Sequence, residues 1–89
     1  MSAILDKMYS VDYIGGEVSD MGILLRNRLK VARAERNMSQ EELASLAGVT
    51  RQTISAVENL QYVPSAQLAF VLARCVAKPV EELFYLEEA

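Results

Sequence analysis

The feature that most constrains the fold of this chain is the stretch Met38–Asn59, where two short helical patterns flank a glycine. Ser39 can cap the first helix, because its hydroxyl accepts a hydrogen bond from a free N–H of the first turn. Glu42 completes a capping box with it. Gly48 is placed to end that helix in the left-handed conformation, which residues with a Cβ adopt less readily. With Thr50 as the next N-cap, the stretch predicts two helices joined by a tight turn.

The second of these helices is expected over about residues 51–59, with one apolar and one polar face. Ile54 and Val57 are spaced to face the core. The outer side of its first turns carries the polar residues Arg51, Gln52, Thr53 and Ser55. Two helices joined by a short turn, with such side chains at the outer start of the second, are typical of a helix-turn-helix that contacts DNA bases.

The same residues resemble the lambda-repressor-like (Cro/repressor, or xenobiotic-response-element) family of helix-turn-helix proteins. The resemblance covers roughly residues 27–85 and is carried by Ser39-Gln40, Leu43-Ala44, Gly48-Val49, Ile54-Ser55 and Glu58-Asn59, with outlying matches at Arg28-Leu29-Lys30, Pro64-Ser65 and Val80–Phe84. It implies an all-α, five-helix lambda-repressor-like domain over residues 21–89, with a short N-terminal extension over residues 1–20.

Helical spacing places the first helix from Met21 or Gly22 to Arg36 or Asn37, and the fourth from about Ala66 to Ala77. The last helix is expected to open at Lys78-Pro79, since proline suits the first helical position. Leu60 stands where the resemblance predicts glycine. Either Leu60 is strained by about 1–2 kcal/mol in a left-handed conformation, or the loop takes another path.

Residues 1–20 lie outside the resemblance. Within them, Met8–Ile14 alternates well enough for a short strand, and Gly15-Gly16 indicates a turn or joint. Three interpretations stay open: a tail, an arm that packs on the domain or pairs with a symmetry mate, and a minor-groove arm. The acidic residues of the segment disfavour the last, because minor-groove arms use arginine.

The net charge of the 89-residue chain is −3, which by itself argues against a nucleic-acid partner. Its distribution matters more than its sum. Residues 1–25 carry −3 and residues 64–89 carry −2, whereas residues 26–63, which hold the helix-turn-helix, carry +2. Non-specific DNA binding should therefore be weak, which leaves more of the affinity to specific contacts and dimerisation.

The expected DNA contacts follow from residue type and position. Arg51 can bond guanine O6 and N7 as a fork, and Gln52 can bond adenine N6 and N7. Gln40, at the start of the first helix of the pair, can hold a phosphate. The predicted DNA-binding set is Gln40, Thr50, Arg51, Gln52, Thr53, Ser55, Asn59 and Tyr62.

Two structural roles are also expected. The resemblance implies that Arg33 and Glu58 form a partly buried ion pair that ties the first helix to the recognition helix. A domain this small buries only about 60% of its unfolded surface, so a second copy is a usual source of stability. The candidates for a homodimer interface are the apolar or aromatic residues Val71, Cys75, Phe84, Tyr85 and Leu86.

An enzyme is a poor fit, because the chain has no histidine, the commonest general base. No metal or cofactor is expected. No apolar run approaches the ~18 residues of a membrane span, and a single Cys75 suits a reducing cytoplasm. The predicted function is a DNA-binding transcriptional regulator that acts as a homodimer, with a toxin or an antirepressor as a further partner. The alternative is an antitoxin or a protein-interaction adaptor on the same fold.

Overall fold

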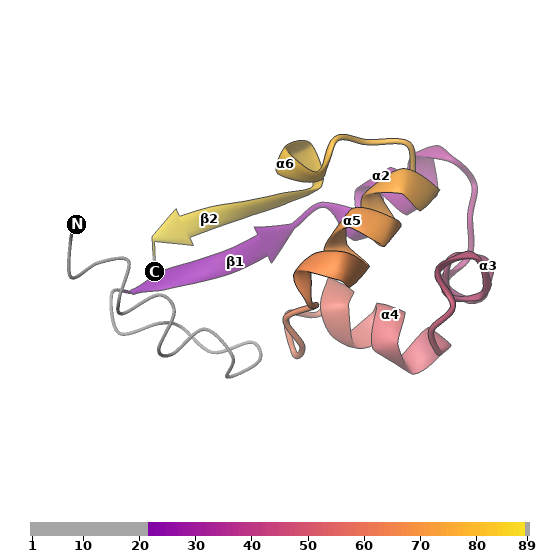
Figure 1. The fold of residues 1–89 in the computed structure, drawn as a ribbon, viewed down its shortest axis with the longest axis horizontal. Helices are drawn as coiled ribbons and strands as arrows, with labels where there is room; N and C mark the ends of the chain where they lie inside the picture. The colour runs from indigo at the N-terminus through magenta and orange to yellow at the C-terminus, as the bar shows by residue number, and fades with distance from the viewer. Residues whose placement is uncertain (1–21, 89) are drawn as a thin grey trace.

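The computed structural model describes residues 22–88. Along the chain the elements are strand β1 (Ile23–Asn27), helices α2 (Leu29–Glu35), α3 (Gln40–Ala47), α4 (Arg51–Glu58), α5 (Ala66–Cys75) and α6 (Val80–Leu83), and strand β2 (Phe84–Glu88). Figure 1 shows the helices gathered into one body, from which the two strands extend together as a ribbon at the end away from α3. The predicted extension over residues 1–20 lies outside the described residues.

The helix-turn-helix forms with the caps that its sequence predicts. Ser39 Oγ accepts a 3.0 Å hydrogen bond from the Glu42 N–H, and the Ser39 N–H donates one of 2.8 Å to the Glu42 carboxylate. Gly48 ends α3 at a φ of 76°. Thr50 Oγ1 accepts a 3.1 Å bond from the Thr53 N–H and so caps α4. These bonds and the φ of Gly48 confirm the predicted caps. Each cap depends only on residues close together in sequence, so the sequence alone was enough to predict it.

The prediction of an all-α fold is wrong. The described residues contain a two-stranded antiparallel sheet in addition to five helices. Residues 23–27, expected as the first turns of a long helix, form β1, and α2 begins only at Leu29. After Leu83 the chain leaves its last helix and forms β2, so that α6 has only four residues.

One local contact and one pairing of distant segments explain both corrections. The Asn27 side chain accepts a 3.0 Å hydrogen bond from the Leu29 N–H, which starts the helix after Asn27. Aromatic residues favour strands, and Phe84 pairs with Asn27 in a register that continues to Ile23 and Glu88. Helical spacing is a local signal, and this pairing overrides it.

The two faces of the ribbon differ because side chains alternate along a strand. On one face, Arg26 lies 3.2 Å from the Glu87 carboxylate, and the Arg28 guanidinium sits 5.2 Å from the centre of the Tyr85 ring. On the other face, Phe84 enters the hydrophobic core and Leu25 packs against it. The ribbon is thus anchored to the helices at one end.

The core lies between the helices and contains Ile54 and Val57, which helical spacing predicts to face inward. Leu29, Leu43, Ile54, Val57 and Leu72 are fully buried, and the rest of the core consists of Ala32, Ala44, Ala73, Val76, Leu83 and Phe84. Since each of α2 to α6 contributes to one cluster, the helix-turn-helix is held rigidly by its neighbours.

Leu60 adopts the left-handed conformation, with a φ of 61°. The Gln61 N–H donates a 2.8 Å hydrogen bond to the Ala56 carbonyl, as expected for a helix end of the Schellman type. Of the two possibilities left by the sequence, the strained one is found. Helices α2 and α5 end in the same way, through Asn37 and Ala77.

Candidate nucleic-acid interface

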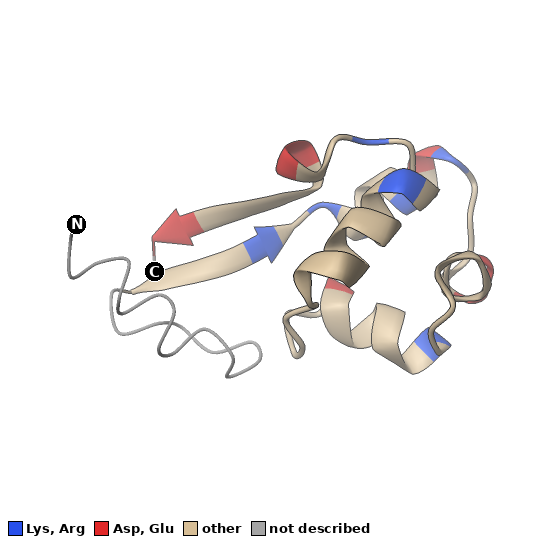
Figure 2. Cartoon of the chain, viewed as in Figure 1, with Lys and Arg blue, Asp and Glu red and all other residues tan. Residues whose placement is uncertain are grey.

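The starts of α3 and α4 meet at the molecular surface. Arg51 and Gln40 are the first residues of their helices, and Arg51 Nη1 donates a 3.2 Å hydrogen bond to Gln40 Oε1. In Figure 2 the start of α4 is marked by a basic band. Helix starts present free N–H groups and the positive end of the helix dipole, so this corner can hold an anion.

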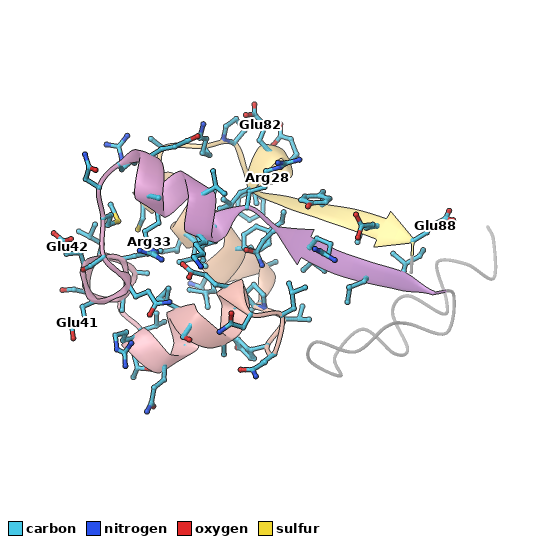
Figure 3. All side chains as sticks on the ribbon, turned by 180° about the vertical axis from the view of Figure 1, so that it is seen from behind. Arg28, Arg33, Glu41, Glu42, Glu82 and Glu88 are labelled. Carbon is cyan, nitrogen blue, oxygen red and sulfur yellow. The ribbon has the colours of Figure 1, made fainter. Side chains whose placement is uncertain are left out.

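Acidic residues also occur at this corner, at Glu41 and Glu42 in the first turn of α3 (Figure 3). The Glu42 carboxylate is engaged by Ser39 in the capping box. The Glu42 carboxylate accepts from the Ser39 backbone N–H and, to a smaller extent, from the Ser39 side chain, and both interactions lower the pKa of Glu42 below its ordinary value of 4.5. Both carboxylates interact favourably with the positive end of the α3 dipole, and their negative charge weakens the attraction of this corner for a phosphate.

The polar residues of α4 lie along its accessible side. Arg51, Gln52 and Asn59 are exposed, whereas Thr53 and Ser55 are half-buried. Two pairs are joined by hydrogen bonds: the Thr50 and Thr53 hydroxyls at 3.0 Å, and Asn59 Nδ2 with Ser55 Oγ at 3.3 Å. Tyr62, 43% exposed, lies in the loop beyond α4.

Arg33 and Glu58 form an ion pair between α2 and α4. Arg33 Nε donates to Glu58 Oε2 at 2.8 Å, and the side chains are only 14% and 3% exposed. Arg33 Nη1 also donates to the Met38 carbonyl at 2.8 Å. Figure 3 shows Arg33 pointing from α2 into the space beside α3 and α4. The pair therefore fixes α4 relative to α2 and to the chain that leads into α3.

A further contact of this ion pair was not expected from the sequence. Gln40 Nε2 donates a 3.0 Å hydrogen bond to Glu58 Oε1, so Gln40 bonds Glu58 and Arg51 at once. Gln40 and Glu58 are distant in sequence and belong to different helices, and helical spacing holds no signal for such a pair. Only the docking of α3 against α4 brings them together.

The five candidate interface residues lie on different parts of the surface. Val71 and Cys75 line a groove between α3, α5 and α6, next to Leu46 and Phe70, which are each 62% exposed. Phe84 belongs to the core and is 9% exposed. Tyr85 and Leu86 lie on β2, where Tyr85 contacts Arg28 and Leu86 is exposed. The groove is thus separate from the ribbon.

Within residues 22–88, no three His, Cys, Asp or Glu side chains gather closely enough to hold a metal ion. The described helices reach at most the ten residues of α5, too short to cross a bilayer core of about 30 Å.

A helix-turn-helix family model matches residues 29–83, more than half of the chain. The chain belongs to the lambda-repressor-like helix-turn-helix family. A family member from Methanocaldococcus jannaschii is 44% identical over 64 residues, which span 72% of this chain and 97% of the relative. YgzD of Bacillus subtilis is 42% identical over the same length and again covers 72% and 97%. Both relatives are described as uncharacterized HTH-type transcriptional regulators.

A similar solved structure is that of the restriction-modification controller protein C.AhdI from Aeromonas hydrophila. It is 33% identical, has a TM-score of 0.59, and covers 62% of this chain and 80% of its own. The lambda-repressor-like family comprises DNA-binding transcriptional regulators and not enzymes. This chain is therefore a DNA-binding protein of the transcriptional-regulator type.

Proposed function

We propose that this protein is a sequence-specific regulator of transcription, a repressor, that binds double-stranded DNA as a homodimer with α4 in the major groove. The observation that carries the proposal is the contact between Gln40 and Arg51 at the shared start of α3 and α4. It sets a guanidinium suited to guanine beside a helix end suited to phosphate.

The proposed contacts divide into two groups. Arg51 and Gln52 read base edges, because their exposed side chains stand at the start of the recognition helix and present fork-shaped donor and acceptor groups. Thr53 and Ser55 have short, half-buried side chains, so they can reach a base edge or a phosphate only where the DNA lies close to the surface of α4. The phosphate contacts are assigned to Gln40, Thr50, Asn59 and Tyr62.

The groove between α3, α5 and α6 is the proposed homodimer surface. Leu46, Phe70 and Val80 form its apolar lining, and exposed apolar patches in small proteins mark interaction sites. Arg74 lies at the same groove, and the exposed Glu81 follows Val80. In a twofold contact, each surface meets its own copy, so these opposite charges can pair across the axis.

The twofold arrangement makes a prediction about the DNA site. Two recognition helices that enter successive major grooves need half-site centres about 34 Å apart, one helical turn of DNA. The site should therefore be palindromic. We propose that the protein acts in the cytoplasm. We also propose that a toxin or an antirepressor controls it by binding a surface other than the one that contacts DNA.

The test is selection of DNA sites from a random duplex pool by the purified full chain, with sedimentation to determine the oligomeric state. A palindromic site recovered by a dimer supports the proposal. A protein that recovers no sequence overturns it.

Two matched variants test the dimer surface. Phe70→Glu places a charge in the groove and should yield a monomer with weakened operator binding. Val31→Glu places the same charge on the equally accessible surface of α2, where Val31 is 57% exposed, and should leave the dimer intact. Equal behaviour of the two variants would place the interface elsewhere.

The second candidate function is an antitoxin or an interaction adaptor, and the exposed Leu46 and Phe70 favour it. In that case the groove binds another protein. A monomer in sedimentation that keeps its selected DNA site would indicate this alternative, because the groove would then remain open in the DNA-bound form.

A further inference from the structure

A continuous series of polar contacts runs from the interior of the protein to the proposed DNA surface. Arg33 bonds Glu58, Glu58 Oε1 accepts from Gln40 at 3.0 Å, and Gln40 Oε1 accepts from Arg51 at 3.2 Å. We propose that Glu58 is a positioning residue for DNA recognition: it orients the Gln40 amide, and the amide in turn orients the Arg51 guanidinium. This inference depends on the proposed function for its consequence at DNA.

The chemistry of the three groups allows only one arrangement. An ionised carboxylate only accepts hydrogen bonds, and a guanidinium only donates them, whereas an amide has one donating and one accepting end. Between Glu58 and Arg51, Gln40 must therefore point its NH₂ at the carboxylate and its oxygen at the guanidinium. The charge on Glu58 thus determines which end of Gln40 faces Arg51.

Burial makes Glu58 a fixed reference point. Its side chain is 3% exposed and is held by two donors of Arg33, Nε at 2.8 Å and Nη2 at 3.3 Å. Gln40 is half-buried and Arg51 is exposed. Order therefore decreases along the series, and the contacts restrict the long Arg51 side chain before DNA arrives. Restricting a side chain in its bound conformation lowers the entropy lost on binding.

Glu58→Gln changes this arrangement with almost no change in side-chain volume. The new amide has one oxygen where the carboxylate had two, so it cannot accept from both Arg33 Nε and Gln40, which bond different oxygens of Glu58. If its oxygen faces Arg33, its NH₂ faces the Gln40 NH₂. Gln40 must then rotate its amide, which turns a donor toward Arg51 and breaks the last contact.

A double-mutant cycle with Arg51→Ala tests the coupling at DNA. In the wild-type background, Glu58→Gln should weaken binding to the selected site about tenfold, and it should reduce discrimination at the base pair that Arg51 contacts. In the Arg51→Ala background the same substitution should have almost no further effect. An equal loss in both backgrounds would overturn the proposal, because Glu58 would then act on folding alone.

A second variant covers the case in which Glu58→Gln fails to fold, because that variant disturbs the buried Arg33. Gln40→Met keeps the Arg33–Glu58 pair and removes both amide contacts. The part of its effect that acts through Arg51 should again vanish in the Arg51→Ala background. The part that comes from a lost phosphate contact of Gln40 should remain in that background and should lower the salt dependence of binding. A Gln40→Met loss of the same size in both backgrounds would contradict positioning.

Nuclear magnetic resonance of the free protein provides a readout that needs no DNA. Side-chain ¹⁵N relaxation should show an ordered Arg51 guanidinium in the wild type and a mobile one in Glu58→Gln and Gln40→Met. Equal mobility in all three proteins would overturn the positioning role. If the wild type selects no DNA site while Arg51 is ordered as expected, the proposed function fails and the positioning contact stands.

Discussion

Asn27 Nδ2 donates a 2.9 Å hydrogen bond to the backbone carbonyl of Val57, at the far end of the recognition helix. The oxygen of the same amide accepts from the Leu29 N–H. One side chain therefore ends β1, starts α2 and satisfies a carbonyl in the last turn of α4. The ribbon and the proposed DNA-reading helix are joined at this residue.

Asn27→Ala should lower the free energy of unfolding by about 1–3 kcal/mol, because it removes both hydrogen bonds and leaves the Val57 carbonyl without this donor. Chemical denaturation monitored by circular dichroism measures the change. The control is Asn59→Ala, whose exposed amide bonds only the Ser55 hydroxyl at 3.3 Å. If both substitutions cost the same, the Asn27 contact has no special part in stability.

The backbone at Leu60 leads to a paired prediction. Leu60→Gly should stabilise the protein by up to about 1 kcal/mol, because glycine adopts the observed φ of 61° without steric strain. Gly48→Ala should destabilise it by about 1–2 kcal/mol through φ alone, since a Cβ there would have no heavy atom within 4 Å. Thermal melting of the two variants measures both effects. A destabilised Leu60→Gly would show that the half-buried leucine side chain contributes more than its conformation costs.

The capping box at Ser39 and Glu42 predicts a specific pH dependence. The pKa of Glu42 is lower in the folded protein than its ordinary value of 4.5, so the folded state favours the charged form. Its contribution to stability is fully present above pH 4.5 and is lost as the pH falls through the lower, folded value. Glu42→Gln keeps a side chain that can cap but does not titrate. The stability difference between wild type and Glu42→Gln, measured by denaturation at pH 7 and pH 3, should shrink at pH 3; a constant difference would argue against this.

Arg51→Ala should weaken binding to the selected DNA site by about 1–3 kcal/mol and relax specificity at one base pair. The reason is the loss of a bidentate donor, and fluorescence anisotropy with matched and altered duplexes measures it. The comparison substitution is Arg36→Ala, which removes an exposed positive charge near the end of α2. Equal losses on selected and random DNA would make Arg51 a phosphate contact only.

Removal of residues 1–20 tests the N-terminal extension. The shortened chain should keep its DNA-contacting face intact, since no proposed DNA contact is lost, and should change its self-association. The described part of the chain begins next to the tip of the ribbon, where Ile23 pairs with Glu88, away from the contact between Gln40 of α3 and Arg51. Sedimentation and thermal melting decide the matter: unchanged values would mean that the extension is a tail.

The sequence predicted the parts of the structure that depend on neighbouring residues. The caps at Ser39, Gly48 and Thr50 follow from local chemistry, and the inward positions Ile54 and Val57 follow from the helical period. The ribbon could not be predicted in this way. Its strands lie beyond both ends of the matched region 29–83, and each has a sequence that also suits the end of a helix.

The candidate site shows the same division. The exposed position of Arg51 and Gln52 at the start of α4 was predictable from helical spacing. The link from Gln40 to Glu58 was not, because it depends on how two helices dock. Leu60 lies between these cases: its strain was one of two outcomes that the sequence allowed, and the geometry of the loop selects it.

The antiparallel ribbon also has a consequence for the order in which the protein assembles. By pairing Ile23 with Glu88 it encloses every helix of the described chain in a single loop. Closing so long a loop has an entropic cost that must be met before the strand contacts contribute. The helix-turn-helix, built from contacts between neighbours in sequence, can form earlier, and the strands can pair once the helices have brought them together. We therefore expect the ribbon to form after the helix-turn-helix and to open before it.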